Sequence, residues 1–164
     1  MPKGTKRLKH KNFLFLNVTP SEATKSWKRV LTSTDFAIGM NAVTESLDFI
    51  ADESPTESLT GYNPSIAQTQ HAYIGDPVYD YVEILRFNRA VGTDAMTDYM
   101  LVHQDRNTDD EQIAEMGSAT IVIDSDDMVA GTITYSISTN GTPSRGHAEI
   151  GADGNPIFTP EVTP

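Results

Sequence analysis

Apolar and polar side chains alternate without interruption from Gly131 to Thr139. Ile133, Tyr135 and Ile137 are separated by Thr or Ser residues, so an extended chain buries one face and exposes the other. The Asn140-Gly141 pair that follows is typical of a turn and predicts that the strand ends there. The segment therefore predicts a half-buried antiparallel strand.

Weaker signs of strands recur along the rest of the chain, between clusters of Asp, Ser, Thr and Gly. Apolar residues at every second position, or short apolar runs, mark these segments: Phe13–Val18, Trp27–Leu31, Phe36–Met40, Leu47–Phe49, Ser65–Gln70, Tyr99–Leu101, Ala119–Ile123, and a closing pair, His147–Ile150 and Pro156–Phe158. A chain of 164 residues is long enough to bury a core of its own. We expect a mainly β fold, an antiparallel β-sandwich or barrel.

One segment departs from the β pattern. Asp76-Pro77 has the composition of a helix N-cap and first turn, and Gly92 suits the left-handed position after a helix. These features predict one flanking α-helix at about residues 77–91. An apolar stripe at helical spacing should cover the sheet, and it consists of Val78, Tyr81, Val82 and Leu85.

The same helix carries a second apolar group, Ile84, Phe87 and Val91, on another side. A helix that faces solvent does not need these residues, so they predict a contact with a second subunit. A helix held between the sheet and a loop of its own chain explains the spacing equally well.

Two polar stretches lack any regular period. They are Ala51–Pro64 and Gln104–Gly117, both rich in acidic and small polar residues. We expect long loops or hairpin tips, which in a small domain are often functional.

Charge is distributed unevenly. The first eleven residues hold five of the 12 basic residues and no acid, so the remainder has a net charge of 7 − 23 = −16. Such a body repels nucleic-acid phosphates. We expect residues 1–11 to form a basic flexible arm, either solvated or in contact with an acidic neighbour or nucleic acid, and residues 12–164 to form a single β domain.

The sequence offers no recognisable catalytic, metal or cofactor site. It contains no cysteine, no HExxH, no GxSxG, no GxGxxG and no phosphate-binding GxxxxGK[ST] motif. We expect no enzymatic activity and no cofactor. An acidic β-fold hydrolase stays the weakest of the alternatives, because 23 acids bring some pair together in any fold.

Aromatic residues leave a binding function open. Trp27, Tyr62, Tyr73 and Tyr79 could line a groove for a sugar or peptide. The alternative function is therefore a β-sandwich carbohydrate-binding or adhesin module, although packing is the commoner use of such residues.

The order of the central segments resembles the tail tube (major tail) proteins of long non-contractile-tailed phages, the siphophages. In that family an acidic Ser/Thr-rich loop ending in Gly-Tyr is followed by a strand, a Gly-Asp helix start, a helix with arginines, and Thr-rich strands. The matching positions here are Asp52, Glu53, Ser54, Gly61, Tyr62, Gly75 and Asp76. The resemblance covers residues 27–158, and the basic first eleven residues have no counterpart in it.

The resemblance implies a virion protein, assembled in the host cytoplasm, whose hexameric rings stack into a tube for DNA ejection. Its partners would be copies of itself and the tape-measure, tail-tip and tail-terminator proteins, with DNA passing unbound and no membrane involved. The implied ring-stacking loop contains Asp52, Glu53, Glu57 and Tyr62. Acids expected to line the lumen are Glu45, Asp48 and Asp98.

Overall fold

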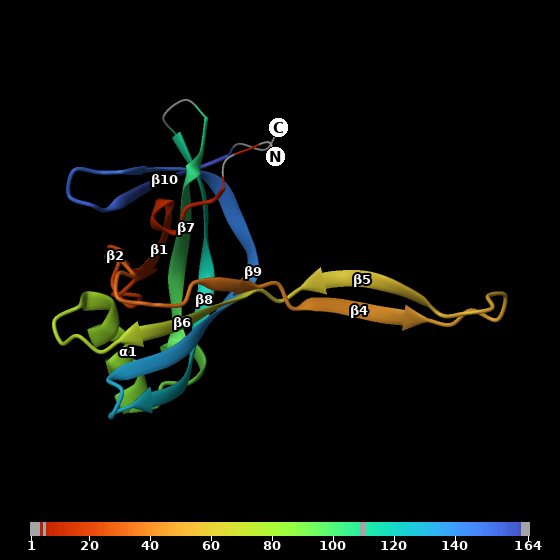
Figure 1. The fold of residues 1–164 in the computed structure, drawn as a ribbon, viewed down its shortest axis with the longest axis horizontal. Helices are drawn as coiled ribbons and strands as arrows, with labels where there is room; N and C mark the ends of the chain where they lie inside the picture. Colours follow the sequence, from red (N-terminus) through yellow and green to blue (C-terminus); the bar gives the residue numbers. More distant parts are fainter. Residues whose placement is uncertain (1–3, 5, 109–110, 162–164) are drawn as a thin grey trace.

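The computed structural model describes residues 4, 6–108 and 111–161, and Figure 1 shows their fold. Most of these residues lie in strands. The strands are β1 (Asn12–Asn17), β2 (Trp27–Arg29), β3 (Ala37–Gly39), β4 (Ala42–Leu47), β5 (Thr56–Tyr62), β6 (Ser65–His71), β7 (Met96–Thr108), β8 (Glu111–Asp127), β9 (Thr132–Ile150) and β10 (Pro156–Pro160). The helices are α1 (Pro77–Asn88) and the short 3-10 turns η1 (Lys9–Lys11) and η2 (Gly92–Ala95).

One antiparallel sheet forms the body of the molecule. Its strand order is β2-β1-β7-β8-β9-β6-β3, and β10 also pairs with β9. The first part of β9 pairs with β6, from Thr132 to Ser138, and its last part pairs with β10, from Gly146 to Ile150. The predicted mainly β, antiparallel fold with one flanking helix is confirmed.

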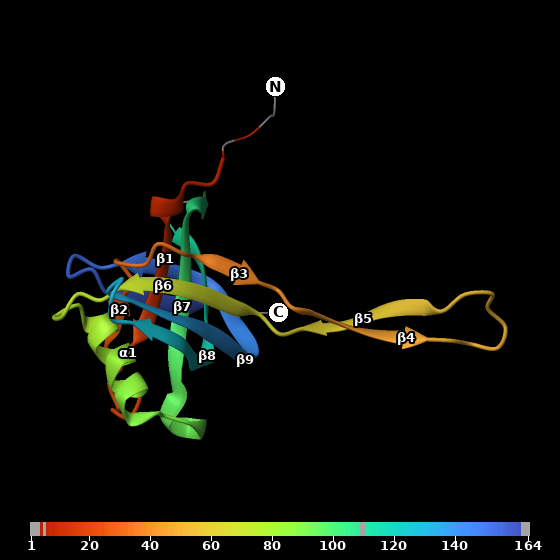
Figure 2. The same cartoon turned by 60° about the horizontal axis from the view of Figure 1, so that its bottom comes forward.

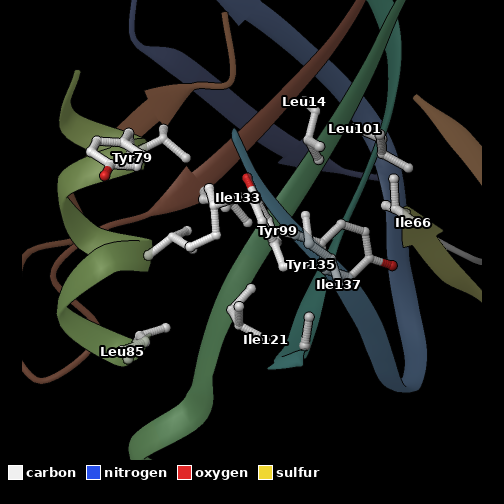
Figure 3. Close-up of a cluster of buried hydrophobic side chains, with 14 residues drawn as sticks. Leu14, Ile66, Tyr79, Leu85, Tyr99, Leu101, Ile121, Ile133, Tyr135 and Ile137 are labelled. Atoms are coloured by element: carbon white, nitrogen blue, oxygen red, sulfur yellow. The ribbon is translucent and has the colours of Figure 1, made fainter. Parts of the chain in front are cut away.

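The sheet is buried on both faces at β1. Successive residues of β1 point to opposite sides, and all six are buried. The larger apolar cluster lies between the sheet and α1 (Figure 3), and it includes Leu14, Leu16, Val78, Val82, Tyr99, Leu101, Ile121, Ile133, Tyr135 and Ile137. The second cluster lies on the other face and consists of Phe13, Phe15, Met100, Val102, Ala114 and Ala148.

A tyrosine of the larger cluster makes a buried hydrogen bond to a side chain beside the cluster. The Tyr135 hydroxyl donates to Gln70 Oε1 at 2.8 Å, and both residues are fully buried. Burial raises the pKa of Tyr135, so its hydroxyl stays protonated and available as a donor. The buried amide oxygen is thereby satisfied.

The strand predicted at residues 131–139 is confirmed, but its predicted end is wrong. Ile133, Tyr135 and Ile137 are completely buried, whereas Asn140 and Gly141 lie inside β9. The register with β8 shifts here, from Ser118 opposite Asn140 to Met116 opposite Ser144. Gly141 has a φ of +65°, so the turn-forming pair produces a bulge within a continuing strand.

Helix α1 begins as predicted and ends earlier. Asp76 Oδ1 accepts hydrogen bonds from the backbone N–H groups of Val78 and Tyr79, at 3.0 and 3.2 Å. The left-handed position after the helix belongs to Arg89, with a φ of 49°. The prediction that Gly92 holds this position is wrong, because the chain leaves the helix three residues sooner and Gly92 begins η2.

Removing the Asp76 cap is expected to weaken the subunit measurably. Asp76→Ala leaves the first-turn N–H groups without their acceptor, and we expect a loss of about 1 kcal/mol in the free energy of unfolding. Urea denaturation followed by circular dichroism measures this loss. Asp80→Ala, which removes an acid from the same first turn without removing the cap, should cost less; equal losses would contradict the assignment.

The stretch expected as a loop at residues 51–64 is the tip and second strand of a hairpin. β4 and β5 pair from Ala42 opposite Tyr62 to Leu47 opposite Thr56, and this hairpin projects well beyond the body (Figure 2). The other stretch, residues 104–117, was also expected to be loop or hairpin tip. It belongs to the β7–β8 hairpin, in which Thr108 at the end of β7 pairs with Glu111 at the start of β8, and residues 109 and 110 lie outside the described residues.

Candidate assembly surfaces

The projecting hairpin is anchored at its base by asparagines. The Asn41 side-chain amide donates to the Asn63 carbonyl at 2.9 Å and lies 3.1 Å from Ser65 Oγ. Asn63 N–H in turn donates to the Asn41 carbonyl at 3.1 Å. Asn41 adopts a φ of 47°, a conformation that Asn tolerates better than most residues. These contacts fix the hairpin to the end of the β3–β6 pair, and sequence reasoning missed them.

The hairpin has no core of its own. Every residue of β4 and β5 is exposed or half-buried, and β4 and β5 form a separate two-stranded sheet. An isolated two-stranded hairpin is marginally stable in water, and unpaired strand edges invite further pairing. The hairpin therefore has the properties of a segment that packs on another surface.

The residues predicted for a stacking loop all lie on this hairpin. Asp52 and Glu53 lie at its tip, and Glu57 and Tyr62 lie on β5, all of them exposed. Among the described residues, none of the three acids takes part in an ion pair. The structure thus brings the four residues onto one projection, although Tyr62 lies at its base.

The second apolar group of the helix is uncovered in the single chain. The side chains of Ile84 and Phe87 are 57% and 76% exposed, and they share a shallow hollow of about 400 Å³ with Asp80, Glu83 and Asn88. The idea that a loop of the same chain covers this side of the helix is therefore wrong. Val91 is also exposed, but it lies beyond the end of α1 and lines a neighbouring hollow with Val122.

Ion pairs of Arg86 join the helix to the sheet beside this surface. Its Nε lies 2.7 Å from Asp126 Oδ2 on β8, and its Nη2 lies 3.3 Å from Glu83 Oε1. Both carboxylates also lie near Tyr79, whose pKa is raised mainly by burial. The apolar face of α1 is thus presented by a helix that is held in place by charge as well as packing.

The three acids predicted for a lumen do not share one surface. Glu45 lies on β4, and Asp48 follows directly after that strand, both exposed on the hairpin. Asp98 lies on β7 in the body, where Lys25 Nζ approaches its Oδ2 to 3.1 Å. The charge of Asp98 is therefore partly balanced, whereas the two hairpin acids have no such partner among the described ion pairs.

No protein-family model and no curated protein sequence matches this chain. Solved structures do match its fold. A chain from the tail of an empty gene transfer agent particle, refined with helical and C6 symmetry, aligns with a TM-score of 0.58 at 13% identity, covering 85% of this chain and 98% of that one. A chain of the virion of a native gene transfer agent particle aligns at 0.56 and 12% identity, with the same coverage of both chains.

The chain has a phage-tail-like fold. The alignment covers most of this chain and nearly the whole of each matching chain, so the likeness extends well beyond a shared fragment. At this low identity the likeness concerns the fold, and it carries no residue roles from one chain to the other.

Within this phage-tail-like fold, the aromatic residues expected to line a sugar or peptide groove lie apart. Tyr79 is only 6% exposed in the larger cluster, whereas Trp27 packs against the second cluster on the opposite face. Tyr62 lies on the hairpin. The structure therefore does not assemble these aromatic side chains into one groove.

Metal-binding groups, membrane-spanning helices and clustered histidines are further features that would indicate a function in the described part of the chain. Its residues contain no group of three or more metal-ligating side chains, and none of its helices is long and apolar enough to cross a membrane. His103 and His147 come together in one shallow hollow with Glu115 and Arg145, which the sequence did not predict. His103 lies 2.7 Å from Asn12 Oδ1 and so belongs to the packing of β7 on β1.

Proposed function

We propose that this protein is the structural subunit of a phage-like tail tube. Copies assemble into six-membered rings, and the rings stack into a conduit through which DNA is ejected. The observation that carries the proposal is the match of the whole fold to a chain from a tail with C6 symmetry. The exposed hairpin, the uncovered helix surface and the acidic body of the single chain support it independently.

The hairpin supports the proposal because it is exposed and lacks a hydrophobic core of its own. In an assembly its edges and tip pack on a neighbouring subunit, and we assign ring stacking to Asp52, Glu53, Glu57 and Tyr62. The apolar surface of Ile84 and Phe87 has the same need for a cover. We assign it, together with Val91, to a contact between subunits.

Charge supports the transit of DNA without binding. Residues 12–164 carry a net charge of −16, which opposes the adsorption of phosphates to the body. We propose that Glu45 and Asp48 contribute to the field around the conduit. Asp98 contributes less, because Lys25 balances it. Tape-measure, tail-tip and tail-terminator proteins would be the other partners of such a tube.

Electron microscopy tests the proposal directly. The purified protein, concentrated or seeded with a preformed tail tip, is expected to form rings or tubules that show six-fold symmetry in end views. A protein that stays strictly monomeric at every concentration and with every seed would contradict the proposal.

The helix surface gives a second prediction. Phe87→Asp places a charge on a residue that is 76% exposed, so the subunit should fold normally and assemble poorly. We expect the concentration needed for assembly to rise by about tenfold or more, as for the loss of a central apolar contact. Sedimentation measures this concentration. Asn88→Asp adds the same charge in the same hollow and should have a smaller effect; equal effects would point to charge alone.

A further inference from the structure

The hairpin carries only negative charge. Residues 42–62 contain five acids and no Lys or Arg, and no Lys or Arg occurs anywhere between Arg29 and Arg86. The acids of the hairpin are Glu45, Asp48, Asp52, Glu53 and Glu57. All are exposed, so they carry their charge into any contact that the hairpin makes.

The N-terminal arm, residues 1–11, is the opposite in composition. It contains five basic residues and no acid, so its formal charge of +5 matches the −5 of the hairpin. Lys3 lies outside the described residues. Lys6, Arg7 and Lys9 are exposed, Lys11 is half-buried, and none of the four appears in an ion pair of the described chain.

The two charged segments do not meet among the described residues of the chain. The described residues of the arm and the hairpin leave the body in different directions in both views (Figures 1 and 2). The ion pairs among the described residues join Lys25 to Asp98 and Arg86 to Glu83 and Asp126, and so involve neither segment. The described residues therefore leave both charged segments available to a second copy of the chain.

A groove at the base of the arm is complementary to the hairpin tip in chemical character. It has a volume of about 560 Å³, and its lining combines Lys9, His10 and Arg29 with the exposed apolar side chains of Leu31 and Phe36. One acid, Asp35, also lies in this groove. The lining is thus apolar in part and basic on balance.

The tip of the hairpin also combines apolar and charged side chains, but its charge is negative. Phe49 and Ile50 are 56% and 108% exposed, and they lie between Asp48 and Asp52. Apolar side chains exposed at the end of a projection stabilise a contact when they are buried there. Acids on both sides of them would then face the basic residues of the arm.

We infer that the acidic tip of the β4–β5 hairpin of one copy docks on the basic N-terminal arm and the adjoining groove of a second copy. The inference rests on the proposed assembly and gives the basic arm its role. The contact is heterologous, since the two surfaces differ, and heterologous contacts build rings or stacks of rings. It also removes the repulsion that uncompensated acidic tips would exert on one another.

A charge-swap experiment with the full-length chain tests this contact. Lys6→Glu with Arg7→Glu lowers the formal charge of the arm from +5 to +1, and Asp52→Lys with Glu53→Lys changes that of the hairpin from −5 to −1. Each pair alone is expected to weaken self-association at low salt by about tenfold or more, and the protein with all four substitutions should regain most of it. Sedimentation measures self-association of any stoichiometry, and electron microscopy records separately whether rings or tubes form.

Asp124→Lys with Glu149→Lys is the matched control, because it reverses two exposed acids that lie outside the hairpin. The control pair should leave self-association nearly unchanged. If rings form equally well with the arm substitutions and with the tip substitutions, the inference is overturned and the proposed function stays intact. Charge-dependent self-association without rings or tubes would support the contact and count against the proposed function.

The same variants decide between a protein and a nucleic-acid partner for the arm. Reversal of Lys6 and Arg7 that abolishes binding to a DNA duplex but leaves self-association unchanged would overturn the inference. Raising the salt concentration should weaken the wild-type contact, because exposed charges are screened. Phe49→Ser tests the apolar part of the contact, and it should weaken self-association at high salt as well as at low salt.

Discussion

Excision of the hairpin is expected to abolish self-association while the body of the subunit stays folded. Residues 41–63 would be replaced by Asn-Gly, a pair that closes two-residue hairpin turns between antiparallel strands. Gly39 already pairs with Ser65 at this point, so the turn joins β3 to β6 directly. No residue in this range belongs to either buried cluster.

The expected change in the free energy of unfolding is therefore small, within about 1 kcal/mol, since the shortened loop also costs less entropy to close. Urea denaturation measures the stability of the body, and sedimentation measures association. Pro64 is kept because its carbonyl accepts hydrogen bonds from the backbone N–H and the hydroxyl of Thr139, both at 3.0 Å. Normal rings or tubes from the excised protein would show that the hairpin is not an assembly element.

Gly146→Ala is expected to destabilise the subunit more than Asp76→Ala or Phe87→Asp does. A Cβ at this position would collide with the backbone of β10 and its extension, at the Thr159 carbonyl, and would lie 2.8 Å from Pro160 Cα and 2.9 Å from Glu161 N. Backbone atoms cannot rotate away as a flexible side chain can. The strand β10 must therefore move off β9, and Phe158 leaves its place against the second cluster.

We expect a loss of about 3 kcal/mol or more in the free energy of unfolding, at the upper end of the range for overpacked positions. Gly61→Ala is the matched control, because its added Cβ meets no atom within 4 Å and Gly61 does not need a positive φ. Thermal or urea denaturation compares the two variants. Equal stabilities would mean that β10 does not pack closely on β9 at this position.

Local sequence patterns were sufficient where burial follows a regular period. The alternation of Ile133, Tyr135 and Ile137 predicted a strand, and the three side chains are fully buried. The Asp76-Pro77 pair predicted the start of the helix, because capping depends on residues that are close in sequence. The mainly β fold with one helix followed from these elements.

Contacts distant in sequence decided the features that were missed. An Asn-Gly pair alone favours a turn. Here β8 pairs with β9 on both sides of Asn140-Gly141, so the pair forms a bulge within the strand. The second strand of the hairpin, Thr56–Tyr62, was expected as loop because it buries neither face and so lacks an apolar period. Helix α1 ends at Asn88 because Arg89 adopts a left-handed conformation and the Ala90 N–H bonds back to the Leu85 carbonyl, although the nearest glycine lies further on.

The candidate assembly surfaces were predictable only where their residues are close in sequence. The hairpin acids are close in sequence and therefore stay together in the structure. Asp98 could not be separated from Glu45 and Asp48 by sequence, because its partner Lys25 approaches it only through the pairing of β1 with β7. The groove beside the arm combines Lys9 with Arg29 and Phe36, and only the folded chain brings these residues together.

The length of β9 has a consequence for how the subunit responds to heat. This one strand of 19 residues supplies Ile133, Tyr135 and Ile137 to the cluster under the helix and Ala148 to the cluster on the other face. Unfolding of either cluster would disturb the backbone hydrogen bonds of β9, and these hydrogen bonds also hold the residues of the other cluster in place. We therefore expect the body to denature as a single cooperative unit, with calorimetric and van't Hoff enthalpies in agreement.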